Sequence, residues 1–342
     1  MSIRMKETIC FDDVLLRPKF SDIMSRQDIE TSSVMNGVDY KAPIMSSPMD
    51  TVSETEMAKS MDKLGAIAII HRYNTVQQQS SLIHTAHASG AKNIGAAIGV
   101  SGDYLERAKS AVMAGANVLC VDIAHGHHAM MKNALKNLRS MFHEDITVIA
   151  GNVATLEAFN DLSDWGAHGV RVGVGGGSIC STRIMTGHGV PTLQSVLDCS
   201  QSDRDAVLIA DGGIKTSGDI TKAIAAGADF VMLGSMLSGT DETPVEKIWS
   251  PEKNAWVYPY RGMASVEAQI DWRGHTASVE GVASVVVQKG PVKDVVEDAL
   301  RGLRSGMSYS GSRKISEFQS KAEFIRQTQG SQIESSTHIN RV

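Results

Sequence analysis

AVLIADGGIKTSGDITKAIAAGADFVMLGS, residues 206–235, contains one β/α unit and the strand that follows it. Its two apolar runs, 206–212 and 230–235, are hydrophobic on both faces, which is typical of buried parallel strands. Between them, 217–226 has the periodicity of an amphipathic helix, with Ser217 as its expected capping residue. The stretch therefore predicts a strand–helix–strand unit of a parallel sheet.

The same alternation runs through most of the chain. Eight apolar runs are expected to be strands: 43–47, 66–70, 93–99, 118–124, 147–152, 169–174, 206–212 and 230–235. Amphipathic segments between them include 54–64, 102–114, 127–141 and 155–165, with Ser53 and Thr155 as further capping residues. Eight β/α units predict an α/β fold of the (β/α)8 TIM-barrel type; a doubly wound sheet with extra strands is the alternative.

The alternation ends after the eighth strand. Residues 236–290 form a long stretch with hairpin-like pieces, and insertions of this length are often lids or binding loops. A helix is expected over 292–305, followed by a polar C-terminal tail, 318–342. We therefore expect residues 1–342 to form a single barrel domain with a flap insertion around 236–290.

Composition and charge exclude several classes of protein. The chain has 342 residues, of which 21% are charged and 42% hydrophobic, and its formal net charge is −5. This balance is ordinary for a globular enzyme and unlike the basic field of a nucleic-acid binder. No apolar run reaches the length of a membrane span, and the N-terminal MSIRMKETIC lacks the apolar core of a signal peptide. We expect a cytoplasmic protein that binds neither nucleic acid nor membrane.

The unusual residues follow the expected strands, at the end where barrel enzymes carry their sites. The stretch GVGGGSICSTR, 173–183, puts Cys180 on a glycine-rich loop. Such a loop lets a ligand approach closely, and its amides can hold phosphate or its carbonyls a monovalent cation. The four cysteines show no CxxC or zinc spacing, so a tight turn with an incidental cysteine is the alternative to a nucleophile.

Two other glycine-containing loops follow the next strands. Asp211-Gly212-Gly213 ends one of them and Gly234-Ser235 ends the other. Barrels often bind phosphate at the loops after strands seven and eight, and a carboxylate such as Asp211 suits sugar hydroxyls. Together these loops predict a site for a nucleoside monophosphate.

These residues resemble the IMP dehydrogenase / GMP reductase family along nearly the whole chain. The resemblance implies a barrel, an assembly into homotetramers, and a shared covalent mechanism. The matching motifs are FDDVLLRP (11–18), SSPMDTVSE (46–54), DIAHGH (122–127), AGNVAT (150–155), GGGSICSTR (175–183), IADGGIKTSGD (209–219), ADFVMLGS (228–235) and YRGMAS (260–265).

The resemblance also implies roles for single residues. Cys180 would be the thiolate that attacks carbon 2 of the purine, with Thr182 and Glu280 as the proton-handling pair. The phosphate would be held by Ser178, Gly213, Gly234, Ser235 and Tyr260. Asp211 would take the ribose hydroxyls, and the remaining nucleotide pocket would be lined by Ser47, Met49, Gly262 and Met263.

The implied cofactors are a nicotinamide dinucleotide and potassium. The dinucleotide, NADPH or NAD, would face Asp122, Asn152 and Arg171. Potassium would be bound by backbone carbonyls of Gly175, Gly177 and Cys180, with the tail around Glu334 of a neighbouring subunit.

The family contains two activities, and the segment 266–279 bears on which one this chain has. The dehydrogenase must hydrolyse the covalent adduct, and its long flap supplies an Arg-Tyr pair for this step. Here the segment reads VEAQIDWRGHTASV, which is short and has Trp272-Arg273 instead. The regulatory domain pair inserted in most dehydrogenases is missing too. Both features favour a GMP reductase that converts GMP to IMP with NADPH.

Other features favour the alternative, an IMP dehydrogenase that oxidises IMP to XMP with NAD. SSPMDTVSE, DIAHGH and residues 333–338 are closer to that branch, and His71-Arg72-Tyr73 departs from the lysine-bearing pattern common in both. A non-catalytic nucleotide sensor is a third hypothesis. Retention of Cys180, Thr182 and Glu280 together argues against it.

Overall fold

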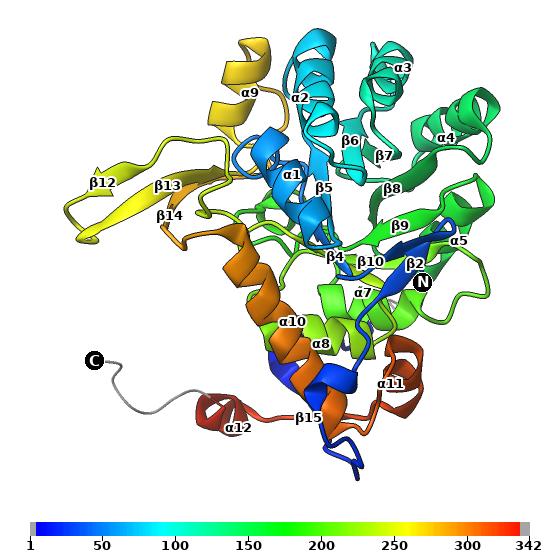
Figure 1. The fold of residues 1–342 in the computed structure, drawn as a ribbon, viewed down its shortest axis with the longest axis vertical. Helices are drawn as coiled ribbons and strands as arrows, with labels where there is room; N and C mark the ends of the chain where they lie inside the picture. Colours follow the sequence, from blue (N-terminus) through cyan, green and yellow to red (C-terminus); the bar gives the residue numbers. More distant parts are fainter. Residues whose placement is uncertain (1–4, 336–342) are drawn as a thin grey trace.

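The computed structural model describes residues 5–335, and within them eight parallel strands close into a barrel (Figure 1). Val231 of β11 pairs with Ile44 of β4, which joins the last barrel strand to the first. The closed ring confirms the predicted (β/α)8 TIM barrel and excludes the doubly wound sheet. The barrel strands are β4 (Ile44–Ser46), β5 (Ile67–Ile70), β6 (Ile94–Ile98), β7 (Val118–Asp122), β8 (Thr147–Val153), β9 (Gly169–Val172), β10 (Val207–Asp211) and β11 (Phe230–Leu233).

Helices surround the barrel and cover the outer face of its strands (Figure 1). Each of them follows a barrel strand, as the alternating pattern of the sequence predicts. The helices are α1 (Thr55–Lys63), α2 (Val76–Ala88), α3 (Tyr104–Ala114), α4 (Ala129–Phe142), α5 (Leu156–Asp164), α7 (Thr192–Cys199), α8 (Ser217–Ala225) and α10 (Val292–Tyr309).

The predicted helix caps are confirmed at one position and wrong at two. Thr155 caps α5, because its hydroxyl accepts a hydrogen bond from the amide of Ala158. Ser217 is not a cap: α8 begins at Ser217, and Thr216 caps it in a capping box with Asp219. Ser53 is not a cap either, because its hydroxyl donates to the carbonyl of Ser47 over 2.6 Å and α1 begins two residues later.

The interior of the barrel is a packed hydrophobic core. Ile69, Ile149 and Ile209 point into it and are fully buried. A hairpin of β2 (Ser33–Met35) and β3 (Val38–Tyr40) precedes β4, and the Tyr40 ring packs edge-on against Phe230, with centroids 5.6 Å apart. Because Met35 and Tyr40 of the hairpin pack against the barrel interior, the hairpin covers the amino-terminal end of the barrel.

A small antiparallel sheet stands outside the barrel between β11 and α10 (Figure 1). It is formed by β12 (Ile248–Ser250), β13 (Ala255–Arg261) and β14 (Ala283–Val287). Helix α9 (Val266–Arg273) connects β13 to β14. The chain therefore leaves the barrel after β11 and returns to it at α10, and we call this segment, residues 234–291, the excursion. Helix α9 lies within it, in the stretch expected from sequence to be a flap.

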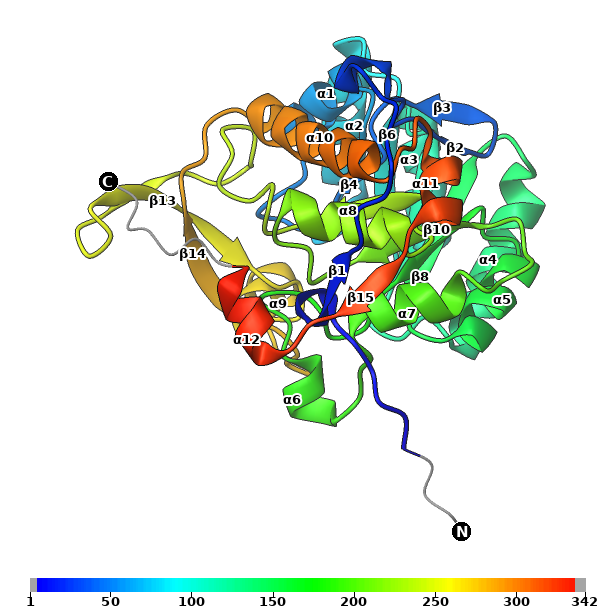
Figure 2. The same cartoon turned by 90° about the horizontal axis from the view of Figure 1, so that it is seen from below.

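The C-terminal part of the chain returns to the N-terminal part. Strand β1 (Val14–Leu16) pairs with β15 (Phe324–Arg326), and the two lie side by side in Figure 2. The predicted tail, 318–342, begins inside α11 (Ile315–Lys321), where Phe318 is fully buried, and includes α12 (Gln329–Glu334). Two short 3-10 helices, Phe11–Asp13 and Arg26–Asp28, complete the N-terminal segment. Within residues 5–335, no helix combines the length and hydropathy that crossing a membrane requires.

Truncation of a barrel-interior side chain should destabilise the whole domain. We expect Ile149→Ala to lower the free energy of unfolding by about 2–5 kcal/mol, because the tight barrel cannot collapse around the cavity. Met113→Ala, on the exposed face of α3, should change it by less than about 0.5 kcal/mol. Urea denaturation measures both, and equal losses for the two variants would contradict a packed interior.

Candidate active site

A cavity of about 490 Å³ opens at the carboxyl ends of the barrel strands. Every site residue predicted from sequence lines it, except Glu334, which lies on α12. Catalytic candidates Cys180, Thr182 and Glu280 share it with the nucleotide candidates Ser47, Met49, Ser178, Asp211, Gly213, Gly234, Ser235, Tyr260, Gly262 and Met263, the cofactor candidates Asp122, Asn152 and Arg171, and the cation candidates Gly175 and Gly177.

Cys180, Thr182 and Glu280 form a hydrogen-bonded chain. The Cys180 thiol donates to Thr182 Oγ1 over 3.2 Å, and the Thr182 hydroxyl donates to Glu280 Oε2 over 2.8 Å. Cys180 is on the loop after β9, Thr182 begins the short helix α6 (Thr182–Thr186), and Glu280 precedes β14. The arrangement can carry a proton between sulfur and carboxylate, as a nucleophile with a coupled base requires.

Main-chain contacts join the cysteine loop to the segment before β14. Cys180 faces Gly281 in an antiparallel bridge. The amide of Ser181 donates to the carbonyl of Glu280 over 2.9 Å, and that of Val282 to the carbonyl of Ile179 over 3.0 Å. The distance between Cys180 and Glu280 is therefore set by backbone pairing as well as by their side chains.

Glycine is required where the loop leaves β9. Gly173 has φ +149°, and a Cβ there would lie 1.9 Å from the carbonyl oxygen of Asp211. A Cβ at Gly176 would lie 2.4 Å from the Thr192 hydroxyl. The glycine-rich loop therefore packs so closely against the end of β10 that a side chain at Gly173 would collide with it.

A buried arginine organises the floor of the cavity. Arg171 donates to Asp122 Oδ1 over 2.5 Å and to Asp211 Oδ2 over 2.8 Å, so two carboxylates balance its charge. Asn152 Nδ2 donates to the same Asp211 oxygen over 2.8 Å. Because these contacts all go to Oδ2, Oδ1 of Asp211 has no partner within residues 5–335 and can accept a ligand hydroxyl.

Tyr260 faces the loop after β11. Its hydroxyl would lie 3.0 Å from a Cβ at Gly234, which places it next to the glycine-containing turn. Burial raises the pKa of Tyr260 to about 12, and a hydrogen bond with Ser178 opposes this in part. The phenol therefore stays protonated at neutral pH and can donate a hydrogen bond to an anion.

The four cysteines differ in their surroundings. Burial raises the pKa of Cys120 and of Cys199 to about 12. The pKa of Cys10 is also raised, by burial and then by its contact with Asp13. Cys180 is half-buried and is the one of the four that lines the cavity. This position fits a nucleophile, whereas Cys120 and Cys199 fit structural thiols.

The structure also brings Arg72, Tyr73 and Trp272 together at the mouth of the cavity. The Tyr73 and Trp272 rings stack with centroids 4.2 Å apart and an angle of 14°. The Arg72 guanidinium lies 5.7 and 5.8 Å from these centroids and donates to the carbonyl of Asp122 over 3.1 Å. Its buried Nε has no partner in the described part of the chain. The unusual tripeptide 71–73 and dipeptide 272–273 were visible in the sequence, but their contact was not.

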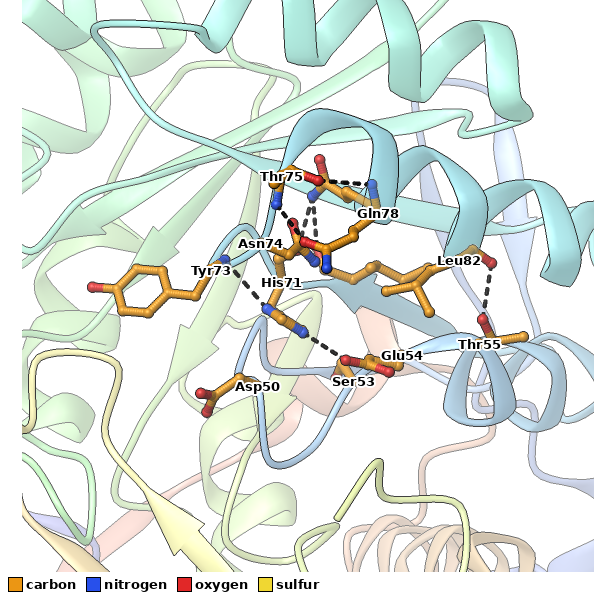
Figure 3. A network of polar contacts seen from close by, with 12 residues as sticks. Asp50, Ser53, Glu54, Thr55, His71, Tyr73, Asn74, Thr75, Gln78 and Leu82 are labelled. Atoms are coloured by element: carbon orange, nitrogen blue, oxygen red, sulfur yellow. Dashed lines mark hydrogen bonds and ion pairs between the residues drawn. The ribbon is translucent and has the colours of Figure 1, made fainter. Parts of the chain in front are cut away.

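A polar network behind Tyr73 holds this loop in place (Figure 3). His71 Nε2 lies 2.9 Å from Glu54 Oε1, and His71 Nδ1 accepts from the amide of Tyr73 over 3.2 Å. Thr75 and Gln78 form a capping box at the start of α2. These groups border a second cavity of about 640 Å³, which Trp272 also lines, and Tyr73 lines both cavities. The network fixes the backbone that presents Arg72 and Tyr73.

Fold and site together define a (β/α)8 barrel with a hydrogen-bonded cysteine in the cavity at its carboxyl-terminal mouth. A family model described as IMP dehydrogenase / GMP reductase domain matches residues 8–338. Relatives include an inosine-5'-monophosphate dehydrogenase of Nitrosopumilus maritimus, 33% identical over 98% of this chain and 99% of its own, and a GMP reductase of Leishmania major, 42% identical over 84% of this chain and 61% of its own. The chain thus belongs to the IMP dehydrogenase / GMP reductase family, whose members are oxidoreductases that act on purine nucleoside monophosphates.

A solved structure has the same architecture. A cysteine-to-alanine variant of GMP reductase from Trypanosoma brucei, in complex with guanosine 5'-monophosphate, superimposes with a TM-score of 0.93 over 98% of this chain and 99% of that chain, at 31% identity. The similarity confirms the barrel and the family. Since relatives of both names match, membership in the family does not by itself decide between the two activities.

The different surroundings of the cysteines should be visible in their reactivity. We expect iodoacetamide at neutral pH to alkylate Cys180 in the native protein well before Cys120 and Cys199, which are buried. Peptide mass spectrometry measures the labelling, and urea-unfolded protein, in which all four react, is the control. Early labelling of Cys120 or Cys199 in the folded protein would contradict the packing described here.

Proposed function

We propose that this protein is a GMP reductase that converts GMP to IMP and ammonia with NADPH, through a covalent adduct of Cys180. The observation that carries the proposal is the chain from Cys180 through Thr182 to Glu280, at a cavity lined by the nucleotide-type loops. The similarity to a GMP reductase structure that holds GMP supports a purine monophosphate as substrate.

The pocket residues divide into three groups around such a substrate. Amides of Gly213, Gly234 and Ser235, with the Ser178 and Tyr260 hydroxyls, would hold the phosphate. The free oxygen of Asp211 would accept from the ribose hydroxyls. Ser47, Met49, Gly262 and Met263 would enclose the remainder of the nucleotide. This orientation directs the purine toward Cys180.

The first chemical step is addition of sulfur to carbon 2 of GMP. The thiol proton moves to Thr182, whose own hydroxyl proton moves to Glu280, and the thiolate forms the bond to carbon 2 while the electron pair of the C2=N3 double bond moves to N3, from where it re-forms that bond when ammonia leaves. The same chain then returns the proton to the exocyclic amine, so that the carbon–nitrogen bond breaks and ammonia leaves. After hydride has reached carbon 2, the carbon–sulfur bond breaks, IMP departs, and the Cys180 thiolate takes a proton from solvent to restore the thiol.

The residues at the other side of the cavity fit a nicotinamide dinucleotide, which when bound supplies the hydride. Asp122, Asn152 and Arg171 form a rigid polar wall beside the cysteine loop. Arg72 adds a cation with an unpartnered buried Nε and no carboxylate partner in the described part of the chain. A guanidinium in this state is suited to a phosphate of the dinucleotide.

Potassium and a homotetramer belong to the same proposal. Gly175, Gly177 and Cys180 lie in one turn, where the carbonyl of Gly177 accepts a hydrogen bond from the Cys180 amide over 3.1 Å. Its second lone pair is left for a monovalent cation, so the residues fit a carbonyl site that would stiffen the loop. Glu334 would add to this site from a neighbouring subunit.

One observation favours the dehydrogenase as a second candidate. Arg273 lines the same cavity as Cys180 from α9, so an arginine is present in the cavity, as hydrolysis of an adduct by the dehydrogenase would require. Its side chain is, however, engaged with Gln269 on the same helix. We therefore keep the reductase as the first candidate. An assay of both reactions distinguishes the two activities.

Purified protein should oxidise NADPH when GMP is supplied and should form no XMP from IMP and NAD. Absorbance of the reduced nicotinamide follows the first reaction, and chromatography of nucleotides follows the second. We expect Cys180→Ala to abolish turnover and Glu280→Gln to lower kcat by about 10²–10⁴-fold. Cys10→Ala, outside the cavity, is the matched control. Sustained XMP formation would overturn the reductase in favour of the dehydrogenase.

The role of Arg72 has a separate test. Arg72→Gln removes a charged donor and should raise the KM for the dinucleotide by about 10–100-fold while the KM for GMP changes little. Arg204→Gln, on the exposed pair with Asp164, is the matched control. A rise confined to the KM for GMP would assign Arg72 to the nucleotide instead.

A further inference from the structure

Gln269 is a buried amide on α9 whose hydrogen-bonding groups are all engaged. Its side chain is 1% exposed. Nε2 donates to the carbonyl of Ala264 over 3.0 Å and to that of Ser278 over 2.9 Å. Oε1 accepts from the amide of Ala277 over 2.8 Å and from the guanidinium of Arg273. One side chain thus connects the start of α9 with the segment 277–278.

The segment that Gln269 holds leads directly to Glu280. The Ser278 hydroxyl donates to Glu280 Oε1 over 2.9 Å, while the Glu280 amide donates to the carbonyl of Ala264 over 3.1 Å. That carbonyl is the one that Gln269 also contacts. The side-chain amide of Gln269 therefore contacts both the segment that precedes Glu280 and the carbonyl to which the Glu280 amide donates.

Helix α9 is itself anchored, so Gln269 acts from a fixed position. Trp272 stacks on Tyr73, which belongs to the β5–α2 loop. Asp271 pairs with Arg261 over 2.5 Å, and Arg261 pairs with Asp50 over 2.6 Å. These contacts join α9 to two loops at the barrel mouth. Since α9 cannot move freely, the 277–280 segment is fixed relative to Cys180 and Thr182.

We propose that Gln269 is a positioning residue for the reaction, because it holds the 277–280 segment so that the Glu280 carboxylate stays in hydrogen-bond contact with Thr182. This inference rests on the proposed function, in which Glu280 handles the proton. Proton transfer needs donor and acceptor within about 2.6–3.2 Å, and Glu280 and Thr182 satisfy this at 2.8 Å. A displacement of about 1 Å in such a site lowers the rate by about 10²-fold.

Two substitutions separate the parts of this contact. Gln269→Met keeps the length of the side chain and removes all its hydrogen bonds. Gln269→Glu keeps the acceptor for Ala277 and Arg273 but loses both donated bonds. We expect kcat to fall about 10–100-fold in Gln269→Met, with the KM for the nucleotide changed less than about threefold. The kcat of Gln269→Glu should lie between that of Gln269→Met and that of the unaltered protein. The kcat of Gln201→Met, at an exposed glutamine after α7, should equal that of the unaltered protein.

A double-mutant cycle with Glu280→Gln tests whether Gln269 acts through the glutamate. We expect the variant with both Gln269→Met and Glu280→Gln to be no slower than Glu280→Gln alone, because the carboxylate that Gln269 positions is already gone. Hydrogen exchange at the Ala277 amide gives a second readout that does not depend on activity. It should be faster in Gln269→Met, and unchanged in Gln269→Glu, while the thermal unfolding temperature of the barrel stays the same.

Each outcome decides the matter. Unchanged exchange at Ala277, unchanged kcat in Gln269→Met, or multiplicative losses in the double variant would each overturn the inference while leaving the proposed function intact. If Glu280→Gln alone had full activity, the proton-handling role in the proposed function would fail, and the positioning role of Gln269 would fail with it. Faster exchange together with a non-multiplicative loss of kcat supports the inference.

Discussion

The site depends on the ion pairs that the buried Arg171 guanidinium forms with Asp122 and Asp211. The Arg171 side chain leaves the middle of β9 and pairs with carboxylates at the ends of β7 and β10, and so links three barrel strands at one mouth. Removal of one member of such a buried pair costs about 3–5 kcal/mol, because a charge is left without a partner. The same contact fixes Asp211, and the carbonyl of Asp211 is the surface against which Gly173 packs. The path of the loop to Cys180 is therefore determined at this arginine.

The last member of the hydrogen-bonded chain from Cys180 through Thr182 to Glu280 comes from outside the barrel. Glu280 is 98 residues from Thr182 along the sequence and reaches it only because β13, α9 and β14 leave the barrel and return over its mouth. Backbone pairing of Cys180 with Gly281 completes the approach. The barrel supplies Cys180, Thr182 and the glycine-containing loops, and the segment between β11 and α10 supplies Glu280. Neither part forms the site alone.

The aromatic stack at the mouth shows how the excursion is held on the barrel. Trp272 of α9 packs on Tyr73. His71 connects the Tyr73 backbone to Glu54, so the loop on which α9 packs is itself hydrogen-bonded to a neighbouring segment (Figure 3). Arg72, between the stack and Asp122, is left with a buried nitrogen that no residue of the described chain satisfies. A cation kept in this state is prepared for a ligand, which connects the packing at the mouth with binding in the cavity.

The sequence by itself determined the features that rest on contacts between residues close together in the chain. Eight apolar runs on a strand–helix period predicted the parallel α/β fold, because buried parallel strands and amphipathic helices are local patterns. The pairing of β11 with β4 was needed to exclude a doubly wound sheet, and once the barrel is given, its strand ends meet at one mouth. The motif glycines, Asp211 and Cys180 could be placed at that mouth for the same reason. The Thr216–Asp219 capping box of α8 is also a local pattern, which the prediction of Ser217 as the cap missed by one residue. The tertiary structure alone decided that Tyr73 meets Trp272 and that Gln269 connects α9 to the segment before Glu280. These contacts depend on the angle at which an excursion folds back on the barrel, and no periodicity in the sequence encodes that angle.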